Sequence, residues 1–276
     1  MMKKRTLALL GVMVLAIGML AGCGEKETAG NAQNDEENIF IVGFDASFPP
    51  YGYRDDNGEY VGFDLDLAAE VCERNDWELV KQPIEWNARD FELSSGAIDC
   101  IWNGFTINGR EDLCTWTEPY VDNSQVFAVA AGNGIEAKSD LAGKVVAVQK
   151  ESSALAALND EENAENIALR DSFAELIEYA DYNTAFMDLE QGAVDAVALD
   201  IGVAQYQIES REEGAFLMLE GDENMLATEQ YGVGFLLGNE ELRDKVQKTI
   251  DEMVADGTFM EIAEQWGLED SVCLGK

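Results

Sequence analysis

Three charged residues follow predicted strands at positions where they could neutralise a small dipolar molecule. Asp45, Arg110 and Asp200 each come shortly after a run of apolar residues. Polar groups in open α/β sheets gather just beyond the carboxyl ends of the strands, where ligands bind. A guanidinium binds a carboxylate through its planar fork, and a carboxylate pairs with an ammonium. Since a free amino acid carries both charges on one carbon, these residues predict the binding of a zwitterion.

Hydroxyl side chains occupy neighbouring positions. Thr106 follows the apolar strand predicted at 98–105, and Ser152 and Ser153 begin the helix predicted after the strand at 145–148. The free N–H groups at the start of a helix favour an anion. The two serines therefore add a second candidate contact for a carboxylate.

Each of these residues also has an ordinary structural interpretation. Arg110 could pair on the surface with the acidic residues that follow it, Ser152 could only cap its helix, and Asp200 could cap the next helix. Phe48 and Trp86 are of types that lie in a core more often than in a ligand site. Residue type alone leaves these alternatives open.

Strand and helix signals alternate through the chain from residue 39 onward. Apolar strand-like runs lie at 40–44, 77–84, 97–105, 144–149, 193–199 and 232–237. Helical spacing or helix boundaries mark 62–75, 86–95, 152–158, 183–191, 201–210 and 240–266, the last with a break near Gly257. This alternation predicts an α/β protein with open, mostly parallel sheets covered by helices.

An internal similarity suggests two related halves. Gly-Ala-Ile-Asp at 96–99 and Gly-Ala-Val-Asp at 192–195 each follow a predicted helix and open a buried strand. A glycine between a helix and a strand is common in proteins, so a chance match between the two segments is the alternative. We expect two similar lobes with a cleft between them, because small ligands bind in clefts.

The composition disfavours several classes of function. The 276 residues contain 18 Lys plus Arg against 55 Asp plus Glu, a formal net charge of −37, and no histidine. The acid excess indicates a solubilising surface and disfavours binding to nucleic acid or an anionic membrane. Without histidine the commonest general base and metal ligand is missing, so hydrolase and zinc chemistry are disfavoured. No cofactor and no metal is predicted.

The N-terminus predicts export. Basic residues at 3–5 precede an apolar run at 6–19, which is typical of a signal peptide spanning 1–22. The run ends in Leu-Ala-Gly-Cys at 20–23, which resembles a bacterial lipobox and implies lipid attachment at Cys23. An ordinary secretory signal is the alternative. Residues 23–37 are polar and predict a flexible tether. Loss of the signal would change the formal charge from −37 to −40.

The remaining cysteines, Cys72, Cys100, Cys114 and Cys273, have spacings that match no zinc site. We expect buried free thiols, with one disulfide as the alternative in an exported protein.

Several motifs in order resemble the polar amino-acid-binding proteins of ABC importers, known as solute-binding protein family 3. They comprise Val-Gly-Phe-Asp-Ala-Ser-Phe-Pro-Pro-Tyr at 42–51, and segments 61–68, 103–107, 118–120, 146–149, 152–154 and 195–200. The resemblance covers about 38–270. It implies the type II periplasmic-binding-protein fold, with lobe 1 at 38–122 plus 230–276, lobe 2 at 126–226, and crossing segments at 121–125 and 227–230.

The resemblance implies roles for the charged end of an amino acid. Arg110 would bind the α-carboxylate, helped by the backbone near Ser152 and Ser153. Asp200 would bind the α-ammonium together with Thr106.

It also implies how the rest of the ligand is held. Phe48 and Trp86 would sandwich the side chain, and Asp45 would meet its polar end. Asn103 and Gly104 belong to the central motif, and the Gly104 carbonyl would help to hold the ammonium.

Two departures from the family pattern bear on the carboxylate site. One residue fewer separates Thr106 from Arg110 than is usual, and Glu151 replaces a usual glycine. The added carboxylate favours a cationic ligand.

The function expected is capture without catalysis. The protein would be a monomeric extracytoplasmic lipoprotein, anchored to the cell membrane, that binds a free L-amino acid, closes around it and docks on a permease through surface carboxylates. Arginine, lysine, histidine, glutamine or cystine would suit the site. The alternatives are a dehydratase of prephenate or arogenate type, with Glu151 or Asp45 as general acid, and the sensory domain of a receptor or channel.

Overall fold

The computed structural model describes residues 38–274. The predicted signal peptide, tether and lipidation site at Cys23 lie outside this range. No helix within the described range is long and apolar enough to cross a membrane.

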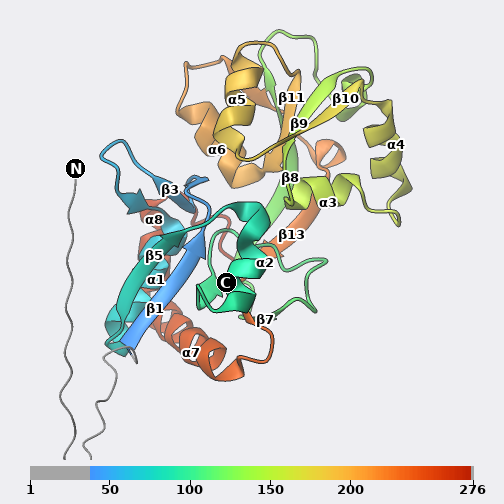
Figure 1. The fold of residues 1–276 in the computed structure, drawn as a ribbon. Coiled ribbons are helices and arrows are strands. Elements are labelled where there is room, and N and C mark those ends of the chain that lie inside the picture. Colours follow the sequence, from blue (N-terminus) through green and yellow to red (C-terminus); the bar gives the residue numbers. More distant parts are fainter. Residues whose placement is uncertain (1–37, 275–276) are drawn as a thin grey trace, which may run out of the picture. The chain divides into compact units, whose positions relative to one another are not determined.

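The first sheet contains five strands and is built from both ends of the described chain (Figure 1). Its order is β5 (Glu78–Pro83), β1 (Ile39–Phe44), β6 (Cys100–Ile101), β14 (Gly234–Leu236) and β7 (Cys114–Trp116). The strand β1 runs parallel to β5 and β6, whereas β14 runs antiparallel to β6 and β7.

The second sheet is built from the middle of the chain. Its order is β10 (Glu175–Tyr179), β9 (Val145–Gln149), β11 (Ala196–Asp200), β8 (Val121–Ala130) and β12 (Phe216–Met218), with β13 (Ala227–Tyr231) beside β8. The strand β9 is parallel to β10 and β11, and β8 is antiparallel to β11, β12 and β13.

Helices and a small hairpin sheet complete the fold. The helices near the first sheet are α1 (Phe63–Asn75), α2 (Arg89–Ser95), α7 (Glu240–Asp256) and α8 (Thr258–Gln265). Those near the second are α3 (Ser153–Leu158), α4 (Ala164–Ser172), α5 (Tyr182–Glu190) and α6 (Ile201–Glu209). The hairpin sheet comprises β2 (Ser47–Phe48), β3 (Gly52–Arg54) and β4 (Tyr60–Val61), and short 3-10 helices lie at Trp86–Ala88, Lys138–Leu141 and Asp222–Asn224.

The predicted α/β class is confirmed, with one difference in the sheets. Parallel pairing is confined to β1, β9 and their neighbours, and the other pairs are antiparallel, so both sheets are mixed rather than mostly parallel. Parallel neighbours need a long crossover, whereas antiparallel strands can pair directly. The strands β8 and β13 of the second sheet pair directly in antiparallel orientation. Only two residues then connect β13 to β14 of the first sheet.

The predicted crossing segments 121–125 and 227–230 lie in this pair. Residues 121–125 form the first half of β8, which continues to Ala130, and they pair with β13 in antiparallel register. The boundaries of the two lobes remain a prediction.

The strand predicted at 97–105 is wrong in length, because β6 contains only Cys100 and Ile101. The chain leaves the sheet near Gly104, whose φ is 54° and whose N–H donates to Asp64 Oδ2 at 2.6 Å. The left-handed backbone at this glycine turns the chain out of the extended direction. Residues 102–106 therefore form a loop at the end of the strand.

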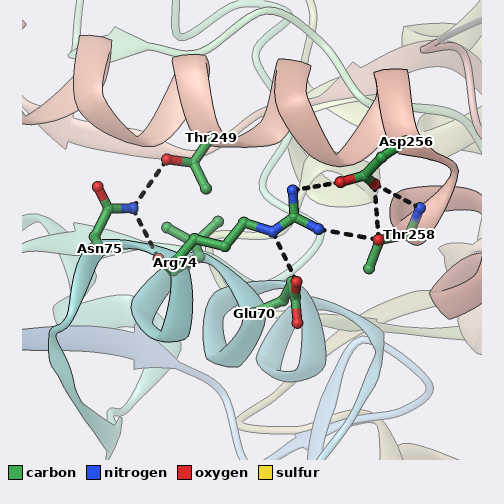
Figure 2. Close-up of polar contacts among 7 residues, drawn as sticks. Glu70, Arg74, Asn75, Thr249, Asp256 and Thr258 are labelled. Atoms are coloured by element: carbon green, nitrogen blue, oxygen red, sulfur yellow. Dashed lines mark hydrogen bonds and ion pairs between the residues drawn. The ribbon is translucent and has the colours of Figure 1, made fainter.

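A polar cluster fastens α1 to the C-terminal helices. Figure 2 shows Arg74 of α1 donating to Glu70 on its own helix and to Asp256 at the end of α7, each at 2.7 Å. Its third contact is Thr258 Oγ1 at 3.0 Å, at the start of α8. Residues more than 180 positions apart are thereby held together, which fixes α1 against α7 and α8.

The described cysteines form no disulfide. Cys72, Cys100 and Cys114 are buried free thiols, as predicted. Burial raises the pKa of Cys72 to about 12 and that of Cys114 to about 11, which keeps both protonated and unreactive. The Cys273 thiol donates to the Pro119 carbonyl at 3.3 Å.

Glu151 lies in a left-handed backbone conformation, with a φ of 56°, between β9 and α3. Glycine adopts this conformation freely, whereas another L-residue is strained there by roughly 1–2 kcal/mol. We expect Glu151→Gly to raise the free energy of unfolding by about 0.5–1 kcal/mol, measured by urea denaturation. Lys150→Gly is the control, because Lys150 has no positive φ and its replacement should destabilise. Equal effects of both changes would contradict the strain.

Candidate functional site

Loops at the ends of the two sheets meet through three contacts that involve predicted site residues. Gln149 at the end of β9 donates to Asp45 Oδ2 at 2.7 Å. Arg110 Nη1 donates to Ser153 Oγ at 2.8 Å. The rings of Phe48 and Tyr182 lie 6.1 Å apart. The structure therefore brings residues of the first half of the chain against residues of the second.

Arg110 is held over the loop that follows β6. Its guanidinium carbon lies 5.5 Å from the centre of the Phe105 ring, and Nη1 also donates to the Thr106 carbonyl at 3.3 Å. None of the ion pairs among the described residues involves Arg110, so it does not pair with the acidic residues next to it. Burial, and then the nearby Arg89 charge, lower the pKa of Arg110. A buried guanidinium without a carboxylate partner suits an anionic ligand.

The start of α3 supplies the contacts opposite Arg110. Ser152 caps the helix by accepting from the Leu155 N–H at 3.2 Å, so its capping interpretation is confirmed. The Ser153 hydroxyl and the Glu151 carbonyl accept from Arg110, the latter at 3.3 Å. The left-handed backbone of Glu151 is therefore part of the arrangement that faces the guanidinium.

Asp200, the last residue of β11, does not cap the following helix. Its Oδ1 accepts hydrogen bonds from Asn123, Gln125 and Tyr231 at 2.8, 2.7 and 2.5 Å. Burial and the charge of Glu229 raise the pKa of Asp200 to about 7. The carboxyl group is thus surrounded by neutral donors rather than by a cation.

Sequence reasoning did not identify Glu229 of β13 as a site residue. Its Oε1 accepts from Thr106 Oγ1 and from the amides of Asn123 and Gln125, each at 2.7 Å. A cavity of about 380 Å³ is lined by Glu229 together with Arg110 and Ser153. The sequence signal for this cluster is the pair of amide residues Asn123 and Gln125, which stand two positions apart in the segment predicted to cross between the lobes.

Asp45 lies at the end of β1 beside a second cavity. Its Oδ1 accepts from the Ser47 N–H at 2.8 Å, and its own N–H donates to Asn103 Oδ1 at 3.0 Å. Burial raises the pKa of Asp45 to about 6. The cavity, of about 450 Å³, is lined by Asp45, Trp86 and three further acidic residues, Glu85, Glu92 and Asp181. This region suits a positively charged group.

The two predicted aromatic walls differ in their surroundings. Phe48 is buried beside Tyr51 and Tyr182, as its core interpretation implied. Trp86 is half-buried, stacks edge-on against Phe105 at 5.4 Å and lines the second cavity. Gly104 packs against Phe48, because a Cβ there would lie 2.8 Å from its ring.

Several buried polar atoms in this region have no hydrogen-bond partner within the described structure. They are Asn103 Nδ2, Asn123 Oδ1, Gln125 Oε1 and the Tyr182 hydroxyl. Native structures leave few such atoms unsatisfied, so these four atoms are available to a polar group of a ligand or to water. Within the described range, no cluster of acidic and cysteine residues could hold a metal ion. The arrangement can hold a small molecule with charges of both signs.

Comparisons with known proteins identify the family of this chain. The model of the bacterial extracellular solute-binding proteins, family 3, matches residues 40–269. The L-cystine-binding protein TcyJ of Escherichia coli K12 is 28% identical over 269 residues, covering 94% of each chain. The ABC transporter arginine-binding protein 1 of the same strain is 25% identical, covering 81% of this chain and 88% of the relative.

Solved structures show the same fold. A substrate-binding protein of an ABC uptake transporter from Streptococcus pneumoniae, with bound histidine, superposes with a TM-score of 0.79 at 30% identity, covering 86% of this chain and 95% of that one. An ancestral arginine-binding protein bound to arginine gives a TM-score of 0.75 at 31% identity, covering 83% and 98%. The fold, the facing charges and the match across residues 40–269 lead to one assignment: this chain belongs to the bacterial extracellular solute-binding proteins, family 3.

Proposed function

We propose that this protein is the substrate-binding lipoprotein of an ABC importer, which captures a free polar or cationic L-amino acid and delivers it to a membrane permease. The observation that carries the proposal is the cavity lined by Arg110 and Glu229, since it places a buried guanidinium and a buried carboxylate around one space. The relatives that are named as binding proteins for cystine and arginine support capture without catalysis.

Arg110 would bind the α-carboxylate of the amino acid. Its present partners are a hydroxyl and two backbone carbonyls, all neutral acceptors. A carboxylate forms stronger, charge-assisted bonds with the same guanidinium, and its negative charge offsets the desolvation of the buried cation. Asp200 and Thr106 would bind the ammonium.

The cavity beside Asp45 and Trp86 would hold the side chain of the amino acid. An aromatic face and four carboxylates line it, and this combination attracts a cation or an amide donor. Arginine, lysine, histidine and glutamine meet this requirement, and the second ammonium of cystine would also meet it.

Closure would follow from contacts made by both halves of the chain. A ligand that touches Arg110 on one side and the Ser153 segment on the other binds the closed arrangement better than an open one. It therefore shifts the population toward closure by its difference in affinity. The closed form, held near the membrane by lipid on Cys23 as a monomer, would dock on the permease through surface carboxylates.

A thermal-shift screen of the common L-amino acids and L-cystine tests the proposal. A ligand present at a hundred times its Kd should stabilise the fold by about 2.7 kcal/mol, because it binds only the native state. Prephenate is included as a separate arm. If no amino acid raised the Tm while prephenate was converted to phenylpyruvate, the dehydratase alternative would replace the proposal.

Arg110→Ala and Asp200→Ala should each abolish detectable binding of the amino acid found in the screen. Each change removes a charged partner of one ionic group of the ligand, which costs about 2–5 kcal/mol of binding free energy. Calorimetric titration measures the loss. Arg170→Ala is the matched control, since Arg170 pairs with Asp171 on the surface and should bind like the native protein. Unchanged affinity in either site variant would refute the assigned roles.

Cys23 should carry the lipid in cells. Mass spectrometry of the mature protein, purified from bacterial membranes, should show an acylated N-terminal Cys23. Cys23→Ser should leave the protein without lipid and move it to the soluble fraction. An unacylated mature protein that begins elsewhere would indicate the ordinary secretory signal instead.

A further inference from the structure

Two buried acidic side chains from different strands lie against the same pair of amides. Asp200 of β11 is 4% exposed and Glu229 of β13 is 7% exposed. The side-chain nitrogens of Asn123 and Gln125 each donate to both carboxyl groups, at 2.7 or 2.8 Å. Two acceptors that share both donors at these distances must themselves lie close together.

The fold supplies this pair with hydrogen bonds but with no directly bonded cation. The other donors are two hydroxyls, that of Tyr231 to Asp200 and that of Thr106 to Glu229. No ion pair within the described residues involves either acid. Two negative charges this close in a buried site repel each other, and neutral donors offset only part of the repulsion. One proton held by Asp200 removes one of the charges.

The other titratable groups around Asp200 and Glu229 do not neutralise the charge of the pair. Burial, together with the charge of Asp200, raises the pKa of Tyr51, Tyr182 and Tyr231 well above the usual range, so all three stay neutral. Arg110 stays charged and acts on the pair only through its field.

Two more acids lie nearby on other elements. Asp64 at the start of α1 is fully buried, accepts from the Tyr120 hydroxyl at 2.9 Å, and has a pKa raised by burial to about 7. Asp45 bonds to Gln149 and not to the pair. Neither shares a donor with Asp200 or Glu229.

The surroundings of the pair suit an ammonium group. Asn123 Oδ1 and Gln125 Oε1 are buried acceptors without hydrogen-bond partners among residues 38–274. Glu229 lines the cavity that also contains Arg110, and Asn123 and Glu229 line a further cavity of about 380 Å³. An ammonium brings three donors and one positive charge, and so provides the charge compensation that the fold does not.

We propose that Asp200 and Glu229 together receive the ammonium group of the ligand, that Asp200 holds a proton before the ligand binds, and that ligand capture displaces this proton to solvent. This inference rests on the proposed function. The balance is simple, because the ligand enters with its ammonium protonated, no bond in the ligand breaks, and the carboxyl proton passes to water or buffer.

The sign of the pH dependence follows. The positive charge of the ligand favours the doubly ionised pair, so it lowers the pKa of Asp200 from about 7. Proton release should therefore be largest below neutral pH and vanish above it. Affinity should fall on acidification by at most about tenfold per pH unit, the limit for one displaced proton.

Calorimetry measures the displaced proton directly. The probe is L-arginine or L-glutamine, whichever binds more tightly at about pH 8, since neither has a side chain that titrates between that pH and about 5. If the screen selects histidine or cystine instead, that amino acid is used and protons of its own groups are subtracted. Titrations at about pH 6 in phosphate and in Bis-Tris, whose ionisation enthalpies differ, should give different heats, corresponding to release of up to about one proton.

Glu229→Gln assigns the proton to the pair. The amide keeps the size of the side chain and removes the charge of Glu229, which is the second cause of the raised Asp200 pKa after burial, so the pKa of Asp200 should fall. We expect weaker binding at about pH 8, heats at about pH 6 that depend less on the buffer than those of the native protein, and a smaller change in affinity between the two pH values. Glu175→Gln, on the exposed part of β10, should behave like the native protein.

The outcomes separate the two proposals. If no amino acid binds the native protein at any pH, the proposed function fails and this inference fails with it. If an amino acid binds with equal heats in both buffers, only the inference is overturned. It is also overturned if Asp45→Asn removes proton release while Glu229→Gln keeps it, because the proton would then come from the other acid. The native protein alone decides the first two points, so failure of a variant to fold leaves them testable.

Discussion

Charge buried without an opposite charge organises the centre of this protein. A guanidinium at Arg110 and carboxyl groups at Asp200 and Glu229 are each shielded from water, yet each is bonded to neutral groups. Desolvation of ionic groups opposes folding unless hydrogen bonds or counter-charges offset it. The fold supplies the hydrogen bonds, and a bound zwitterion would supply both counter-charges at once. Stability and ligand binding are therefore linked through the same few side chains.

The strands β8 and β13 make this arrangement possible. Their antiparallel pairing sets Asn123 and Gln125 of one strand beside Glu229 of the other. Because the same strands join the two sheets, the polar cluster lies where the halves of the chain meet. Under the proposed function, a change in its charge on ligand binding would act on the two strands that connect these halves.

The loop before α3 also contacts Arg110. Glu151 keeps a left-handed backbone although glycine would adopt it without strain, and its carbonyl accepts from Arg110. Strained positions of this kind are often retained at functional sites. The position identified as a departure from the family pattern thus combines a left-handed backbone with a contact to Arg110, a residue of the candidate site.

The sequence by itself determined the alternation of helices and strands, the family, and charged residues at strand ends such as Asp45 and Asp200, because periodicity and local motifs are encoded within short windows. It could not show that Phe48 lies in the core, that Ser152 caps α3, or that β6 ends at Ile101. Glu229 was not identified from the sequence for the same reason. Its importance comes from Asp200, Asn123 and Gln125, which are far away along the chain and reach it only through the pairing of β8 with β11 and β13. Whether a buried acid is compensated depends on its neighbours in space, and that was decided by the tertiary structure alone.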